Sequence, residues 1–247
     1  MRGLSRLTLV EMKLFLREPM MAFFTLAFPL VMLLCFGSVY GNEPSDYFGG
    51  YGMVDVSVPG YAAIVIGMTG FLSLATGITV YRERGVLRRL RMTPLRPYAV
   101  LVSQVAVLLL MTALGIALLV VVAKLLYGMR FHGDVIGVLA AFTLSCLSFF
   151  SMGFVLAGLA PTTRTAQIVG MALFYPMLFL SGATMPLEAM SDTMRHYVKV
   201  LPLNHVVTLL RGMWVGDAWG QHLTEVAVLG SLLVVGVIVS AKTFRWE

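Results

Sequence analysis

Histidines are the side chains in this sequence best suited to acid–base or metal chemistry. There are four of them, His132, His196, His205 and His222. The usual sequence signature of a zinc site is a set of ligands at short spacings, and these four have no such spacing. We therefore predict that they lie at surfaces or interfaces rather than around a metal ion. One alternative stays open, a polytopic membrane enzyme in which His196 and Asp192 act together on the outer side.

Motifs for phosphate binding and acyl transfer do not occur in the sequence. No lysine follows a glycine, so the chain has no G-x-x-x-x-G-K-[ST] loop of the kind that holds ATP phosphates. No serine stands in a G-x-S-x-G turn either. The sequence thus predicts a chain that is not an enzyme and that binds no ATP through a phosphate loop of its own.

An arginine-rich stretch, YRERGVLRRLRMTPLRPY at residues 81–98, carries a third of all Lys and Arg. On a helical wheel it has an apolar stripe and a separate basic face. The stripe consists of Val86, Leu87 and Leu90, and the basic face consists of Arg84, Arg88 and Arg91. This pattern predicts a short amphipathic helix with two possible roles. In the first role, the helix is only a topology signal that is attracted to anionic lipid. In the second role, its apolar stripe docks on a cytoplasmic partner.

The elements that position these residues are membrane helices. The chain is 59% hydrophobic and only 12% charged, with a mean hydropathy of +0.88, whereas soluble domains are about 25% charged. Six apolar stretches are near the length that a membrane helix needs. They are residues 20–40, 58–80, 99–123, 135–160, 168–185 and 226–241, and the last extends to Leu223 and Thr224. We predict an all-α, polytopic membrane protein with six transmembrane helices in a single domain, residues 1–247.

The distribution of basic residues orients these helices. If the N-terminus is cytoplasmic, thirteen of the eighteen Lys and Arg fall in cytoplasmic segments. The first outer connection, GNEPSDYFGGYGMVDVS, then has three acids and no base. Because Lys and Arg favour the cytoplasmic side, we expect both termini and the loop of residues 82–98 there. The six stretches have no Asp, Glu, Lys, Arg or His in their interior, which argues against an ion-driven carrier.

Two further segments are predicted to be amphipathic helices. Residues 1–19 place Arg6, Lys13 and Arg17 on one face, which is typical of an interfacial helix on the cytoplasmic surface. Residues 186–222 are too polar to span the membrane. They predict two short outer-side helices that either lie on the surface or re-enter the bilayer.

Four sequence stretches resemble the ABC-2 type permeases, the membrane subunits of ATP-binding-cassette exporters of the drug, lipid or polysaccharide kind. They are LREPMMAFFTLAFPLVM, RERGVLRRLRMTPLRP, LSGATMPLEAM and LPLNHVVTLLRGMWVG, in the order in which the family has them. The resemblance implies a multi-pass protein of a prokaryotic plasma membrane. It implies a permease pair, homodimeric or with a related chain, that exports a hydrophobic or amphipathic substrate with two ATPase subunits. ATP and Mg would bind to the partner ATPase, with no cofactor in this chain and no nucleic acid involved.

The resemblance also assigns a role to the arginine-rich loop. In the family this loop contains a coupling helix that sits in a groove of the ATPase subunit. Carried over, the contact residues are Glu83, Arg84, Gly85, Leu87, Arg88, Leu90 and Arg91. A further alternative is a membrane scaffold that recruits a cytoplasmic partner through the same helix without transporting anything.

Overall fold

The computed structural model describes residues 12, 13, 15, 22–45, 50–86, 97–183 and 197–243. Within these ranges helices are the only regular elements, as the composition predicts. They are η1 (Phe23–Ala27), α3 (Phe28–Tyr40), α4 (Met53–Met68), η3 (Thr69–Leu74), α5 (Ala75–Glu83), α7 (Pro97–Tyr127), α8 (Val135–Leu159), α9 (Thr163–Leu180), α11 (Pro202–Val215), η5 (Trp219–His222) and α12 (Leu223–Thr243). η1 and η3 are π-helical and η5 is a 3₁₀ turn.

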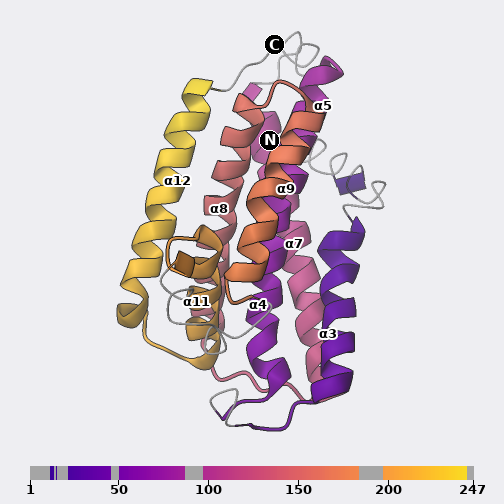
Figure 1. Ribbon diagram of the computed structural model, residues 1–247, viewed down its shortest axis with the longest axis vertical. Coiled ribbons are helices and arrows are strands. Elements are labelled where there is room, and N and C mark those ends of the chain that lie inside the picture. The colour runs from indigo at the N-terminus through magenta and orange to yellow at the C-terminus, as the bar shows by residue number, and fades with distance from the viewer. Residues whose placement is uncertain are drawn as a thin grey trace.

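The long helices lie side by side in one bundle, with α12 along one flank and α3 along the other (Figure 1). α8 packs against α12, η3 and α5, and so forms much of the centre. We name the two ends of the bundle by a residue at each. The Glu83 end holds the end of α5 and the start of α9. The Tyr127 end holds the end of α7 and the start of α4.

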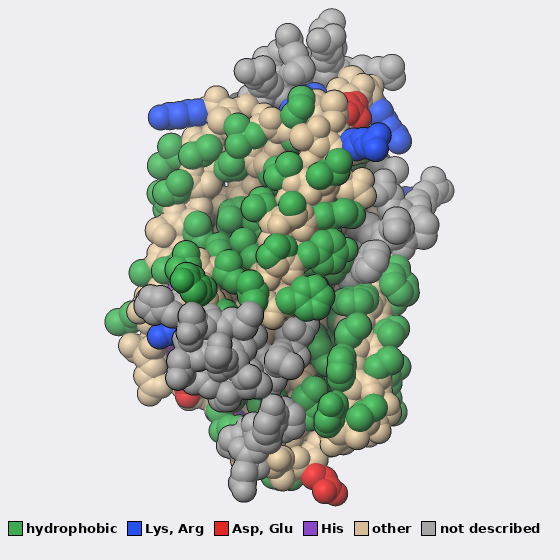
Figure 2. Space-filling view, in the orientation of Figure 1, with side chains coloured by type: hydrophobic (Ala, Val, Ile, Leu, Met, Phe, Trp, Pro, Cys, Tyr) green, Lys and Arg blue, Asp and Glu red, His purple; other side chains and the backbone are tan. Residues whose placement is uncertain are grey.

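Four helical stretches among the described residues are long and apolar enough to span a membrane. They are Met53–Glu83, Leu101–Tyr127, Val135–Leu159 and Trp219–Thr243. Thr25–Tyr40 is apolar but shorter, and the first residues of α9 include Arg164 and Gln167. Figure 2 shows hydrophobic side chains over the middle of one face and charged side chains toward its two ends. These features define a polytopic membrane protein, whereas six full spans stay a prediction.

Several predicted boundaries are wrong. The second helix starts at Met53, not at residue 58, because the carboxylate of Asp55 accepts hydrogen bonds at its N-terminus. It continues through η3 to Glu83, so residues 82 and 83 are helical rather than part of a loop. The third helix runs from Pro97 to Tyr127. The fifth begins at Thr163 and ends at Leu180. The sixth begins at Leu223, as the predicted extension required.

Small residues allow the central helices to approach closely. The Cβ of an alanine at Gly70 of η3 would lie 2.7 Å from the carbonyl oxygen of Phe149, and one at Gly153 of α8 would overlap the carbonyl oxygen of Gly70. Two serines of α8 then hydrogen-bond to α12. Ser148 donates to the carbonyl of Leu229 at 2.6 Å, and Ser151 also donates to the backbone of α12. In lipid, such contacts replace the hydrophobic effect in holding helices together.

The close contact between η3 and α8 makes a testable prediction. Gly153→Ala should lower the free energy of unfolding by about 1 to 3 kcal/mol, because the new methyl group overlaps the backbone of η3. The measurement is the thermal midpoint of the purified protein in lipid nanodiscs. Gly77→Ala is the matched control, since a Cβ there meets nothing within 4 Å. A Gly153→Ala midpoint equal to that of the control would contradict the contact.

A buried carboxylate ties three segments together at the Tyr127 end. The Asp55 residue is only 4% exposed. Its oxygens accept hydrogen bonds from the Arg130 backbone N–H at 2.9 Å, from the Asn42 side-chain amide at 2.9 Å and from the Gly52 N–H at 3.3 Å. Asn42 also donates to the carbonyl of Tyr127 at 3.3 Å. The network fixes the start of α4 against both the α3–α4 connection and the α7–α8 connection.

Helix α11 is packed inside the bundle rather than exposed at its edge. Its buried residues include Leu203, Val206, Leu210 and Trp214, and it packs against α4, α8 and α12. The second of the two predicted short helices is therefore present, and most of its surface is covered by neighbouring helices. The first falls largely at residues 184–196, outside the described residues.

Candidate functional site

The candidate site lies where α5 ends and the arginine-rich segment begins. Glu83, the last residue of α5, extends its carboxylate to the first turn of α9. Oε1 accepts a hydrogen bond from the Thr163 backbone N–H and Oε2 accepts one from the Thr163 hydroxyl, both at 2.7 Å. A carboxylate at this place satisfies a free N–H of the helix terminus and favours the positive end of its dipole. Glu83 thus ties α5 to α9, and its contact with an ATPase stays a prediction.

Arg82 makes a second connection from the same turn of α5. Its guanidinium donates to the carbonyl of Ala157 at 3.0 Å and to the carbonyl of Ala160. These carbonyls belong to the last turn of α8, where backbone acceptors have no partner within the helix. A charged donor is favourable at that negative end. Arg82 and Glu83 together hold the end of α5 against the turn between α8 and α9.

The chain leaves α5 through a short turn. Arg84 is exposed, and Gly85 adopts a positive φ of 66°, which ends the helix. Beyond Val86, the predicted contact residues Leu87, Arg88, Leu90 and Arg91 lie outside the described residues. In the predicted interfacial helix, Arg6 and Arg17 also lie outside them, and Lys13 is helical and exposed.

The Arg82 connection predicts a specific loss of stability. Arg82→Ala should cost about 2 kcal/mol, because hydrogen bonds from a charged group contribute about 1.5 to 3 kcal/mol. For a chain of this size, that corresponds to a thermal midpoint lower by about 4 to 8 °C. Arg164→Ala is the matched control, since Arg164 is an exposed arginine in the adjacent turn of α9. Equal midpoints for the two variants would show that Arg82 does not hold the turn.

The histidines do not gather into one site. His132 is exposed, whereas His205 and His222 are each only 8% exposed. Of the predicted surface or interface positions, His205 and His222 occupy interfaces between helices, because both lie where α11 packs in the bundle. His196 lies outside the described residues. Across the described ranges, no group of three or more His, Cys, Asp or Glu side chains could hold a metal ion.

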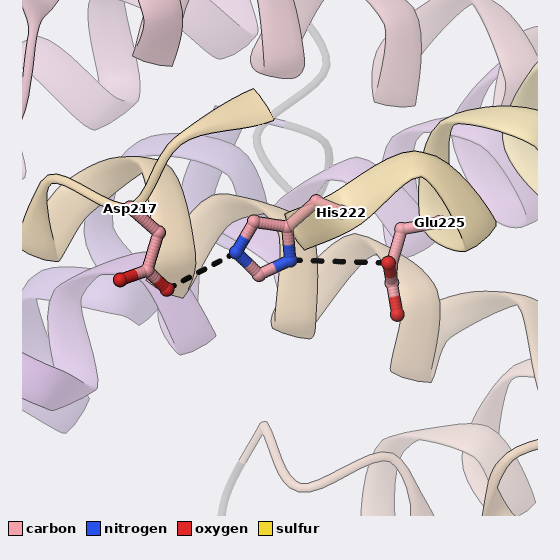
Figure 3. A network of polar contacts seen from close by, with 3 residues as sticks. All are labelled: Asp217, His222 and Glu225. Atoms are coloured by element: carbon pink, nitrogen blue, oxygen red, sulfur yellow. Dashed lines mark hydrogen bonds and ion pairs between the residues drawn. The ribbon is translucent and has the colours of Figure 1, made fainter. Parts of the chain in front are cut away.

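His222 instead forms a small polar network at the start of α12 (Figure 3). Its Nε2 lies 3.1 Å from Oδ2 of Asp217, and its Nδ1 lies 3.8 Å from Oε2 of Glu225. The first contact is a hydrogen bond, and the second is too long to be one. The imidazole also fills the space beside Gly212, where a Cβ would overlap it. His222 therefore joins α12 to α11 and serves packing in this arrangement.

Sequence reasoning missed Arg82 and Thr163 as partners within the site. In the sequence Arg82 is one of the loop arginines, yet it stands in the last turn of a helix and faces α8. Thr163 follows the N-cap residue Thr162, whose hydroxyl accepts a hydrogen bond from Thr165 N–H at 3.1 Å. The helix-start pattern Thr162–Thr163 was the available signal for α9. No local pattern pairs it with Glu83, which lies 80 residues earlier.

A bundle of helices, four of them long and apolar enough to span a membrane, defines a polytopic membrane protein. The chain belongs to the ABC-2 type transporter family, whose model matches residues 3–214. The family identified from the four sequence stretches is thereby confirmed.

Curated relatives agree with this family. The chain is 24% identical to the inner membrane transport permease YhhJ of Escherichia coli (strain K12), over 74% of this chain and 51% of YhhJ. It is 26% identical to the daunorubicin resistance ABC transporter permease protein DrrB1 of Streptomyces coeruleorubidus, over 88% of this chain and 77% of DrrB1. It is 26% identical to nodulation protein J of Rhizobium leguminosarum bv. trifolii, over 89% of this chain and 84% of nodulation protein J. The matched region spans about half the length of YhhJ.

Proposed function

We propose that this chain is the transmembrane subunit of an ATP-driven exporter in a prokaryotic plasma membrane. It pairs with a second permease copy, identical or related, and with separate ATPase subunits that bind ATP and Mg. Membership of the ABC-2 family supports the permease role. The names of the relatives, a transport permease and a drug-resistance permease, support transport as the activity.

The observation that carries the coupling part of the proposal is the double connection at the end of α5. An ATPase that moves the segment after Gly85 pulls on Arg82 and Glu83, which are hydrogen-bonded to α8 and α9. Through these hydrogen bonds, movement of the loop reaches α8 and α9 as well as α5. A loop that served only as a topology signal would not need these bonds.

The proposed cargo is hydrophobic or amphipathic, such as a drug, a lipid or a lipid-linked glycan. Side chains exposed on the candidate spans are largely apolar, for example Leu114, Val121 and Ile238. An apolar substrate can therefore reach the protein from the lipid phase without crossing a charged surface. The daunorubicin permease is a relative whose name includes such a compound.

Coexpression with an ABC ATPase encoded beside this chain tests the proposal. We expect the two proteins to copurify and the complex in lipid vesicles to hydrolyse ATP faster when its substrate is added. The ATPase alone is the control and should show no such stimulation. Substrate movement without any ATPase would refute the proposal. A stable complex that moves no substrate when ATP is supplied would favour a scaffold instead.

A further inference from the structure

An apolar pocket of about 610 Å³ opens between α4, α7, α8 and α11 near the Tyr127 end. Pro59 of α4, Ala117 of α7, Phe142 of α8 and Trp214 of α11 are on its walls. α7 and α8 touch little along their length, and the space left between them is the pocket. It lies away from Arg82 and Glu83, which are at the opposite end of the bundle.

The mouth of the pocket lies on the side of the bundle, between neighbouring helices. Three lining residues are more than half exposed, Val121 at 52%, Val135 at 59% and Leu139 at 55%. They belong to helices long and apolar enough to span a membrane, so in a bilayer this surface meets hydrocarbon. An occupant can therefore enter sideways from the lipid.

Size limits what the pocket can hold. A volume of 610 Å³ lies within the range of about 300 to 1,000 Å³ that is usual for a small ligand. A flexible hydrocarbon chain fits both the volume and the lining.

The charge in the pocket lining indicates what kind of polar group a bound molecule carries at its other end. Lys124 is the one charged residue in the lining, and it is exposed one turn before the end of α7. In the described part of the chain, no carboxylate forms an ion pair with it. A lysine at this depth extends its ammonium group toward the membrane surface, where lipid phosphates lie. The apolar walls and the single cation together match an amphiphile with an acidic head.

We propose that this pocket binds one acyl chain of an anionic phospholipid from the bilayer, with the lipid phosphate on Lys124. The site is separate from the ATPase contact and does not depend on export. Trp214 stands in the wall of the pocket and is 7% exposed, so an acyl chain in the pocket would lie against its indole ring.

Trp214 also supplies the probe. The chain has three tryptophans, so replacing Trp219 and Trp246 by phenylalanine leaves Trp214 alone. This variant is reconstituted in two sets of phosphatidylcholine vesicles. One set contains a small fraction of phosphatidylglycerol with a brominated acyl chain, and the other contains the same fraction of phosphatidylcholine with a brominated acyl chain. Bromine quenches tryptophan at short range only. We expect brominated phosphatidylglycerol to bind about fivefold more strongly than brominated phosphatidylcholine, with binding measured by the quenching of Trp214. A preference of this size is what one lysine near a lipid phosphate gives.

Two pairs of variants separate the pocket from general lipid contact. Lys124→Glu should abolish the preference for phosphatidylglycerol, whereas Arg130→Glu, an equal charge change at a nearby exposed residue outside the lining, should keep it. Ala117→Phe should reduce quenching by filling the pocket. Ala106→Phe, at an exposed position of the same helix outside the pocket, should not.

The proposal is overturned if the two brominated lipids quench Trp214 equally in the variant that has no lining substitution. It is also overturned if the brominated lipid quenches Trp214 equally in the Ala117→Phe and Ala106→Phe variants, because bromine would then reach Trp214 from the surrounding bilayer. Absence of quenching by both lipids would overturn it as well, because no acyl chain would then lie beside Trp214.

Discussion

The Leu87→Asp, Leu90→Asp double variant should insert in the membrane normally and lose its ATPase subunit. Both leucines belong to the apolar stripe predicted for the arginine-rich segment and lie outside the described residues. Burial of a leucine contributes about 1.5 to 3 kcal/mol, so removing two from an interface weakens it by roughly 3 to 6 kcal/mol. That corresponds to about a hundredfold loss of affinity or more. The measurement is copurification of the ATPase with the tagged permease from membranes.

A volume-conserving pair, Leu87→Ile with Leu90→Met, is the matched control and should retain the ATPase. Two results would contradict the interpretation. If the aspartate variant keeps its ATPase, the stripe does not form the contact. If it fails to reach the membrane, the segment acts in insertion and the arginines are a topology signal only.

Asp55→Ala should destabilise the protein by about 3 kcal/mol. The substitution leaves three donors without their acceptor, the N–H groups of Arg130 and Gly52 and the amide of Asn42. Each buried donor that loses its partner costs about 1 to 3 kcal/mol, and water at the bundle end can satisfy some of them. The thermal midpoint in nanodiscs should fall by about 6 to 12 °C.

Two variants test whether the effect belongs to the buried network. Asp55→Asn keeps one acceptor oxygen and should lose less stability than Asp55→Ala. Glu43→Ala removes an exposed acid from the same connection and should leave the midpoint unchanged. An equal fall for Asp55→Ala and Glu43→Ala would mean that charge at this end, rather than the hydrogen bonds, sets the stability.

Hydropathy was sufficient to locate the helices but not their ends. Lipid requires long apolar runs, and these are visible in any single sequence. The start of the second helix differs from the prediction because Asp55 stands in a polar, acidic stretch that is typical of a connection. The carboxylate is tolerated in the helix because its partners come from elsewhere, and one of them, Arg130, lies 75 residues away. The available local signal was an acid in the first turn, three residues after Gly52.

The candidate site was also only partly predictable from the sequence. The wheel pattern at residues 84–91 predicts a surface for a partner because it depends on neighbours in sequence. The bonds from Arg82 to Ala157 and from Glu83 to Thr163 cross 75 and 80 residues. Such contacts depend on which helices are adjacent in the bundle, and hydrophobic periodicity carries no information on that. Glu83 was consequently assigned to an outside contact alone.

The continuous helix from Met53 to Glu83 makes the second span a lever. It carries the Asp55 network at one end and Arg82 with Glu83 at the other, and Gly70 rests against α8 between them. At a rise of about 1.5 Å per residue, the arm toward Met53 is roughly 25 Å long and the arm toward Glu83 roughly 20 Å. A tilt of about 5° around Gly70 would therefore displace the two ends by about 2 Å in opposite directions. A pivot near the middle of this helix would thus convert a small pull at the Glu83 end into a shift of similar size at the Tyr127 end.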